Sequence, residues 1–318
     1  MQTIAVARNA MATRFEIALH GENPVALRAA GEEALDEIER IEAQLSLYRP
    51  TSEIAHLNAR AALEPVRVTP GLFRLLQQAR NLSRETGGAF DITIAPLVRC
   101  WGFMDGAGQI PHPDALAEAR ASVGFHLVEL NEKDCSVRFA RERVALDLGA
   151  IGKGYALERA AELLREAGVT SALLNGGTSS IYALGRPPDA EHWKVAVEYP
   201  AQENAAPTLL AAVPLRDEAL SVSAVWGRFF KLEERLVGHV LDPRAGQPVA
   251  SALLAAVALP SVTETDALST ALLVAGGIGF DQIAGLRPGL RALLLREKDA
   301  NGRFQLKSRG IELSHACS

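Results

Sequence analysis

One stretch near the middle of the chain decides how its two halves are connected: Asp147-Leu148-Gly149-Ala150-Ile151-Gly152-Lys153-Gly154-Tyr155-Ala156. Apolar residues at 144–148 predict a strand, and a helix signal follows and runs to about residue 167. Glycines at such a junction let backbone N–H groups approach a phosphate at the positive end of a helix. The spacing matches neither GxGxxG nor GxxxxGK[ST], so neither a dinucleotide fold nor a P-loop is indicated. A phosphate-binding turn and a plain tight turn both stay open, and Lys153 beside Asp147 slightly favours the phosphate.

The segments before this junction are mainly helical. Residues 3–6 and 14–19 are typical of a β-hairpin, with alternating apolar residues in the second strand. Cap residues and first-turn prolines predict helices that start at about residues 24, 70 and 113. Residues 127–130 and 135–139 predict a further hairpin.

Beyond the junction the chain is mostly β-like. A single helix, at about 264–274 and ended by Gly276-Gly277, interrupts a series of short strands. Strands without a regular helix between each pair argue against a doubly wound parallel fold. The fold class expected is therefore α+β, with mostly antiparallel sheets flanked by helices. No linker or repeat divides the chain, so residues 1–318 are expected to form one unit.

Composition limits the classes of partner. The chain has 318 residues, of which 48% are hydrophobic and 22% charged, as in an ordinary globular protein. Its formal net charge of −5 argues against a nucleic-acid-binding function that depends on a broad basic surface. No uncharged apolar run reaches about 18 residues, so no membrane span is expected. The three cysteines form no CxxC pair, which indicates reduced thiols and a cytoplasmic location.

Asp266 and Thr270 are the first candidate ligand pair. They are four residues apart in the predicted late helix and project from one face near its start. A carboxylate and a hydroxyl are hard oxygen donors that suit Mg²⁺. The spacing alone, however, favours a structural interpretation, in which Asp266 complements the helix dipole and Thr270 faces the core.

His239 and several aromatic residues are further candidates. His239 lies where a β-like stretch meets an Asp-Pro turn, so it could act as a general base or be an ordinary surface histidine. Tyr48, Trp101 and Phe103 could contact a flat aromatic ligand or fill the core. Taken one at a time, these residues identify no function.

In their order along the chain, these segments resemble the ApbE-type flavin transferase family, the FAD:protein FMN transferases. The resemblance covers almost the whole chain. The matching blocks are Met11-Ala12-Thr13, Leu47-Tyr48-Arg49-Pro50, Gly87-Gly88-Ala89-Phe90-Asp91, the stretch from Leu146 to Ala156, Asn175-Gly176-Gly177, His239-Val240-Leu241-Asp242-Pro243-Arg244 and Asp266-Ala267-Leu268-Ser269-Thr270.

The resemblance implies an activity. FAD would be cleaved at its pyrophosphate in the presence of Mg²⁺, FMN joined to a Thr or Ser hydroxyl of an acceptor protein, and AMP released. It also implies one ApbE-like unit, which could form two lobes around a central FAD cleft. Alternatives that stay open are an FAD pyrophosphatase that gives FMN and AMP, and a non-catalytic FAD-binding protein.

The resemblance also assigns roles to residues of this sequence. His239 is the implied catalytic base, and the implied metal ligands are Asp266, Thr270 and a backbone oxygen near Ala150. The sequence departs from the family pattern at Ala12 and Ala95, where Gly is usual, and at Thr178 and Ala224. The implied flavin contacts are Met11, Tyr48, Ala89, Phe90, Asp91, Asp147, Lys153, Val240 and Leu241.

Overall fold

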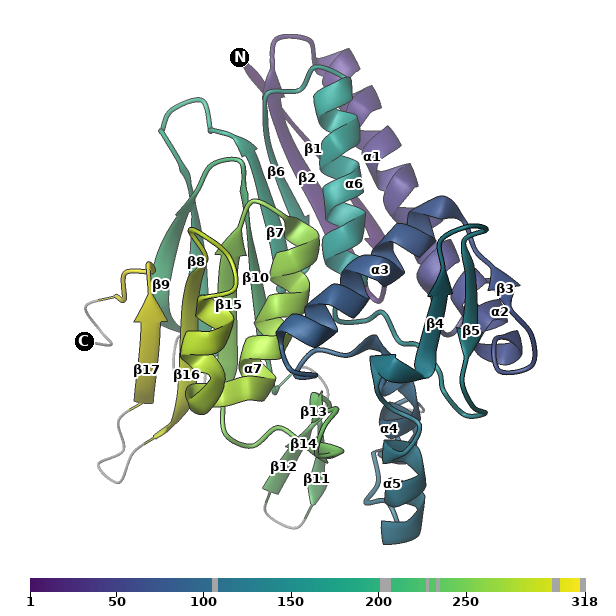
Figure 1. The fold of residues 1–318 in the computed structure, drawn as a ribbon. Coiled ribbons are helices and arrows are strands. Elements are labelled where there is room, and N and C mark those ends of the chain that lie inside the picture. Colours follow the sequence, from purple (N-terminus) through teal and green to yellow (C-terminus); the bar gives the residue numbers. More distant parts are fainter. Residues whose placement is uncertain (105–107, 201–206, 227–228, 233–234, 299–303, 315–318) are drawn as a thin grey trace.

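The computed structural model describes residues 1–104, 108–200, 207–226, 229–232, 235–298 and 304–314. Its largest feature is an eight-stranded sheet with the order β1-β2-β6-β7-β10-β15-β16-β17 (Figure 1). Every neighbouring pair is antiparallel, which confirms the predicted fold class. The strands are β1 (Gln2–Ala10), β2 (Thr13–Gly21), β6 (Ser171–Gly176), β7 (Ser180–Gly185), β10 (Glu218–Ala224), β15 (Leu254–Leu259), β16 (Arg291–Lys298) and β17 (Phe304–Arg309).

Helices cover one face of this sheet. Helices α1 and α6 lie against the half formed by β1, β2 and β6, and α7 lies against β10 and β15 (Figure 1). Their apolar faces and the facing strand residues form the main core, which also takes in α3. The helices are α1 (Pro24–Leu45), α3 (Pro70–Glu85), α6 (Gly152–Glu166) and α7 (Val262–Ala284).

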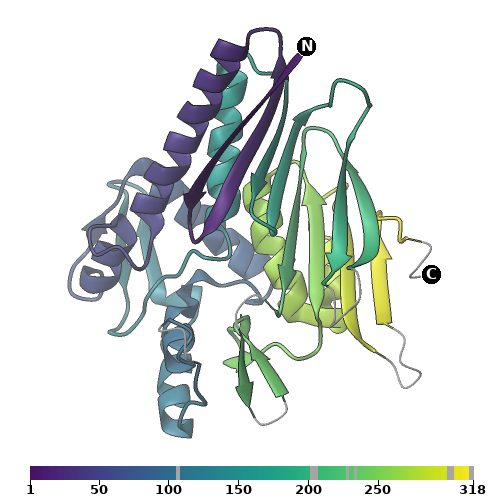
Figure 2. The ribbon, with the colours of Figure 1, turned by 180° about the vertical axis from the view of Figure 1, so that it is seen from behind.

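A two-stranded sheet, β8 (Trp193–Tyr199) with β9 (Thr208–Leu215), covers the opposite face, as Figure 2 shows from behind. Alternate residues of the central strands supply the two cores. In β15, Val257 faces the main core and Ala256 faces the second one. This alternation follows from the two-residue period of a strand.

Smaller elements lie to the right of the helix layer and below it in Figure 1. A third apolar cluster joins α4 to β13 through Leu97, Trp101, Phe103 and Leu241. Trp101 and Phe103 are therefore core residues. The elements are α2 (Glu53–Arg60), β3 (Val66–Arg67), the 3-10 turns η1 (Ile92–Ile94) and η2 (Phe125–Leu127), α4 (Ala95–Cys100), α5 (Pro113–Arg120), β4 (Val128–Asn131), β5 (Ser136–Phe139), and the pairs β11 (Phe229–Leu232) with β12 (Arg235–Gly238) and β13 (Leu241–Asp242) with β14 (Gln247–Pro248).

One local prediction is wrong. Residues 144–148 form no strand, and the side-chain amide of Asn58 makes the backbone contacts that a neighbouring strand would make. Its Nδ2 donates to the Leu146 carbonyl at 2.9 Å, and its Oδ1 accepts from the Leu146 N–H at 2.8 Å. The predicted end of the late helix is confirmed. Gly276 has non-helical angles of φ 60° and ψ −156° and ends the first helical segment, and a second segment of α7 follows this kink and continues to Ala284.

Helix α7 has the length and apolar composition of a membrane span. Most of it is buried in the protein, where it packs on β10 and β15. A buried core helix of a folded domain shows the same composition.

Candidate functional site

The junction between α6 and α7 holds a buried carboxylate. Asp266 is 4% exposed, and its Oδ2 accepts a hydrogen bond of 2.9 Å from the backbone N–H of Gly154, in the first turn of α6. Its Oδ1 accepts from the Ser180 hydroxyl at 3.1 Å. Both donors are neutral, and no Lys, Arg or His of the described residues forms an ion pair with Asp266. A buried carboxylate without a countercharge suits a site for a cation.

Gly154 allows this contact because it has no side chain. A Cβ at this position would lie 2.5 Å from the Val262 carbonyl oxygen and 2.7 Å from the Asp266 Cβ. The backbone of α6 therefore touches α7 directly. Another residue at position 154 would push the two helices apart.

The same contact leaves the Ala150 carbonyl without its usual partner. In a regular helix the N–H of Gly154 would donate to the carbonyl four residues earlier, that of Ala150. That N–H donates to Asp266 instead, while the N–H groups of Ile151 and Gly152 both donate to Leu148. Within the part of the chain that the structure describes, no backbone N–H donates to the Ala150 oxygen. This oxygen is therefore available to a ligand.

Thr270 lies one turn after Asp266 on α7. Its hydroxyl is 3.1 Å from the hydroxyl of Ser223 at the end of β10, and Ser223 also contacts Ser269 at 2.8 Å. Sequence reasoning gave Ser223 no role in the metal site, although it directly precedes Ala224, a position where the chain departs from the family pattern. The described residues contain no cluster of three His, Cys, Asp or Glu side chains. A metal site here would instead combine the Asp266 carboxylate, the Thr270 hydroxyl and the Ala150 carbonyl, all hard oxygen ligands that fit Mg²⁺.

Asp147 lies on the loop that leads into α6, Lys153 lies in the first turn of α6, and both contact Gly149. The Gly149 N–H donates to Asp147 Oδ1 at 2.8 Å, and Lys153 Nζ lies 3.5 Å from the Gly149 carbonyl oxygen. The backbone N–H of Asp147 donates to Ile92 at 2.7 Å, which ties this loop to η1. Lys153, for which the sequence suggests a phosphate contact, is thus at the start of α6, where the helix dipole also favours an anion.

The segment of residues 86–91 is folded tightly beside this loop. Ala89 and Phe90 are buried, so the Phe90 ring belongs to the core. The Asp91 carboxylate is also buried and accepts from the Ser83 hydroxyl at 3.0 Å and from the backbone N–H groups of Thr93 and Phe125 at 2.9 and 3.0 Å. Asp91 therefore organises its own loop, and flavin contacts at Ala89, Phe90 and Asp91 stay a prediction.

Glu42 of α1 connects Met11 with the segment that carries Tyr48. Its Oε1 accepts from the Met11 N–H at 2.9 Å, and its Oε2 accepts from Arg49 at 2.8 Å. Tyr48 is 61% exposed and presents an aromatic ring at the surface, unlike Trp101. Met11 packs against the main core, as do Ala150 and Val240.

His239, Val240 and Leu241 connect β12 to β13. His239 is half-buried, Val240 pairs through its carbonyl with the Val249 N–H at 2.9 Å, and Leu241 is buried against α4. Asp242 then accepts two hydrogen bonds from the Arg244 side chain, of 2.9 and 2.8 Å. Burial acts to raise the pKa of Asp242, but the hydrogen bonds from Arg244 outweigh burial and keep this pKa below its ordinary value.

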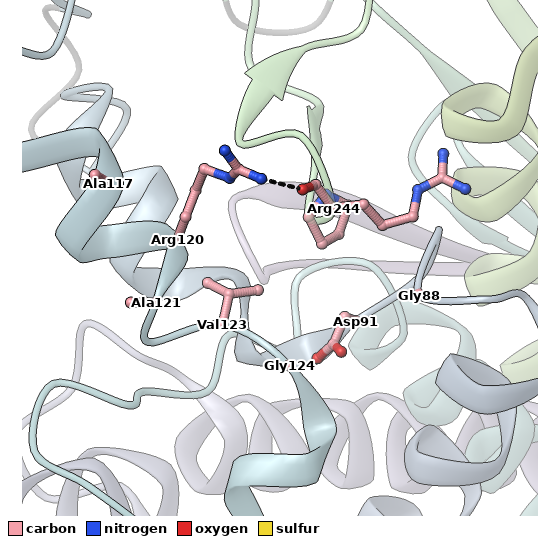
Figure 3. Close-up of a pocket in the computed structure, with 9 residues that line it drawn as sticks. Gly88, Asp91, Ala117, Arg120, Ala121, Val123, Gly124 and Arg244 are labelled. Atoms are coloured by element: carbon pink, nitrogen blue, oxygen red, sulfur yellow. Dashed lines mark hydrogen bonds between the residues drawn. The ribbon is translucent and has the colours of Figure 1, made fainter. Parts of the chain in front are cut away.

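A cleft of about 490 Å³ lies between α5 and the turn that joins β13 to β14 (Figure 3). Arg120 donates to the Arg244 carbonyl at 3.1 Å across it, and the Arg244 guanidinium points the other way (Figure 3). The cleft borders the 86–91 segment through Gly88 and Asp91. Its lining does not include Asp266, Thr270 or His239. None of the residues that line the cleft belongs to α6 or α7, so the cleft is separate from the oxygen atoms at the α6–α7 junction.

Comparison with known proteins identifies the family of the chain. Residues 11–294 match the model of the ApbE family. The FAD:protein FMN transferase of Treponema pallidum is 31% identical over 301 residues, which cover 89% of this chain and 82% of that protein. The structure of the Pseudomonas stutzeri flavinyl transferase ApbE, in its apo form, superposes with a TM-score of 0.83 at 28% identity, covering 97% of this chain and 95% of that one. The ApbE protein of Thermotoga maritima gives a TM-score of 0.83 at 25% identity, with 96% of each chain covered. The chain therefore belongs to the ApbE family.

Proposed function

We propose that this protein is an FAD:protein FMN transferase that uses Mg²⁺. In this reaction a Thr or Ser hydroxyl of an acceptor protein attacks the FMN phosphorus of FAD. The bond between that phosphorus and the oxygen bridging to AMP breaks, a phosphoester forms, and AMP leaves with the bridging oxygen. The hydroxyl proton passes to a base. Relatives named FAD:protein FMN transferase over most of the chain support this proposal.

The observation that carries the proposal is the set of oxygen atoms at the α6–α7 junction. Asp266 is buried without a countercharge, and the Ala150 carbonyl is released from its usual helical hydrogen bond. These two groups and Thr270 would hold the ion. Bound Mg²⁺ would neutralise pyrophosphate charge and stabilise the charge that develops on the phosphoryl oxygens.

Residues of the chain itself would bind and orient the substrate. Lys153 at the start of α6 would contact a phosphate group, because its ammonium and the helix dipole act in the same direction. The exposed ring of Tyr48 would pack against the isoalloxazine ring. His239 would accept the proton of the attacking hydroxyl, since imidazole is a base near neutral pH.

The test compares two aspartates of the same helix. Asp266→Ala should abolish transfer of FMN from FAD to acceptor proteins, because it removes the only carboxylate of the proposed metal site. Asp281→Ala is the matched control, since Asp281 is 80% exposed and pairs with Lys307 at the surface. It should transfer FMN at the wild-type rate. Flavin fluorescence of protein bands and mass spectrometry of the acceptor would measure the product.

Three outcomes would contradict the proposal. Release of AMP without a flavin adduct on any acceptor would indicate an FAD pyrophosphatase. Tight FAD binding without AMP release in the presence of Mg²⁺ would indicate a non-catalytic flavin-binding protein. Full transfer by the Asp266→Ala variant would show that the α6–α7 junction is not the metal site.

A further inference from the structure

A second carboxylate lies at the contact between α6 and α7, on the opposite helix from Asp266. Glu158 of α6 directs its Oε2 at the start of α7, where it accepts from the Thr263 N–H at 2.9 Å and from the Ser261 hydroxyl at 3.1 Å. The Thr263 hydroxyl donates to the same oxygen. Ser261 is also the N-cap of α7. Glu158 therefore caps a helix to which it does not belong.

The two carboxylates form a reciprocal pair of caps. Asp266 of α7 accepts from the Gly154 N–H in the first turn of α6, and Glu158 of α6 accepts from the Thr263 N–H in the first turn of α7. The first four N–H groups of a helix have no partner within it, so each helix satisfies one such group of the other. In Figure 1 the lower end of α6 lies beside the upper end of α7, where these contacts occur.

The two carboxylate contacts together fix the orientation of α7 relative to α6, which one contact would leave free. The Gly154–Asp266 hydrogen bond alone would allow α7 to pivot about that point. The second contact lies one turn further along α6 and ends on the first turn of α7, so the pair resists both sliding and pivoting. Hydrogen bonds that involve a carboxylate are shorter and stronger than neutral ones, which adds to this constraint.

We infer that Glu158 is a positioning residue for the oxygen ligands at the α6–α7 junction. Ala150 precedes α6, whereas Asp266 and Thr270 lie on α7, so the spacing of the three oxygens depends on how the helices are aligned. Glu158 sets that alignment without contacting the ion. This inference rests on the proposed metal site. Residues that orient ligands in this way commonly change metal affinity by about 10- to 100-fold when they are replaced.

The experiment measures binding of Mn²⁺, a spin probe for the Mg²⁺ site, by electron paramagnetic resonance without FAD or acceptor. Glu158→Ala should raise the Kd for Mn²⁺ by about tenfold or more. Glu158→Gln should lie between this variant and the wild type, because the amide oxygen still accepts hydrogen bonds but carries no charge. Glu162→Ala is the control, since Glu162 is one turn later on α6 and pairs with Arg159 at the surface. It should bind Mn²⁺ as the wild type does.

Circular dichroism and thermal unfolding separate positioning from loss of fold. A folded Glu158→Ala variant with weakened Mn²⁺ binding at a temperature well below its Tm supports the inference. If Glu158→Ala fails to fold, Glu158→Gln provides the same comparison. Wild-type affinity for Mn²⁺ in a folded Glu158 variant would overturn the inference. Mn²⁺ binding by the Asp266→Ala variant that equals that of the wild type would also overturn it. A wild type that binds Mn²⁺ through Asp266 but transfers no FMN would refute the proposed function alone.

Discussion

At the scale of single residues, the turn between β1 and β2 is the clearest departure from ordinary backbone geometry. Met11 and Ala12 both have positive φ, of 50° and 58°, and they join the paired residues Ala10 and Thr13. Two-residue hairpin turns with positive φ at both positions normally contain Asn or Gly, because a Cβ there meets the following carbonyl oxygen. The structure thus explains why the family-like pattern has Gly where this chain has Ala12.

The strained turn leads to a stability prediction. Ala12→Gly should raise the free energy of unfolding by about 0.5–1 kcal/mol, the relief of left-handed strain less the larger backbone entropy of unfolded glycine. Urea unfolding would measure the change. Ala7→Gly, at an exposed position within β1, is the control and should lower stability instead. If both substitutions lowered stability equally, the turn would not be strained.

At the scale of elements, an ionic network joins α3 to α7. Arg287, just after α7, donates to both carboxylate oxygens of Glu264 at 3.0 and 2.9 Å, and also to Glu85 at 2.7 Å. The hydrogen bonds to Glu264 raise the pKa of Arg287 above its ordinary value, with a further contribution from Glu85. Glu85 is the last residue of α3 and leads into the 86–91 segment. The network therefore holds that segment against the helix that carries Asp266.

Replacing Arg287 should show what this network contributes. Arg287→Lys keeps the charge but loses the planar fork, and should lower the free energy of unfolding by about 1 kcal/mol. Arg287→Ala leaves both glutamates unpaired and should cost more, about 2–3 kcal/mol at low salt. Denaturant unfolding at low and high NaCl would measure both, and salt should reduce the difference.

Arg60→Lys is the comparison for this prediction. Arg60, the last residue of α2, pairs with Glu64 just beyond the helix, and both side chains are about half exposed. Exposed pairs of this kind contribute about 0.5 kcal/mol or less. An Arg287→Lys effect as small as that of Arg60→Lys would mean that the network is no stronger than a surface pair.

The local signals and the element contacts differ in how well the sequence predicts them. Asn23, Thr69 and Pro113 correctly predict the starts of α1, α3 and α5, because caps and prolines act within one turn. The pairing of Asn58 with Leu146 spans 88 residues and leaves no local trace, so it was missed. The contact between Glu158 and Thr263 was missed for the same reason, because 105 residues separate them in the sequence.

At the scale of the whole molecule, one sheet serves two cores. The helices cover one face and β8–β9 the other, and the main core takes residues from Val6 to Leu294. His20 of β2 lies at the second face, where its ring is 5.5 Å from that of Trp193 and its Nδ1 is 3.0 Å from the Thr3 hydroxyl. Burial lowers the pKa of His20, and the nearby Asp189 opposes this only partly.

This shift predicts an acid-sensitive component of stability. The folded protein holds His20 neutral more strongly than the unfolded chain does, so the unfolded chain takes up the proton first as the pH falls. Stability should therefore decline as the pH falls below about 6.5, the ordinary pKa of histidine, towards the lower pKa of folded His20. His20→Gln should remove this part of the pH dependence in urea unfolding measured between about pH 7.5 and 5.

His56→Gln provides the control for this pH profile. His56 is an exposed residue of α2, and its replacement should leave the profile of the wild type unchanged. An unchanged profile in the His20→Gln variant would mean that other groups cause the loss of stability in acid.

The sequence by itself determined the antiparallel α+β class, most helix starts and the family to which the chain belongs, because these depend on periodicity, caps and short blocks of residues. It also singled out Asp266 and Thr270 by their spacing, whereas the role of Ala150 came only from a resemblance. The tertiary structure decided the surroundings of these residues. The N–H of Gly154 donates to a carboxylate 112 residues away, and the Ala150 carbonyl therefore lacks its usual helical hydrogen bond. Such a contact depends on how two helices pack against one sheet, and no local pattern in the sequence records that packing.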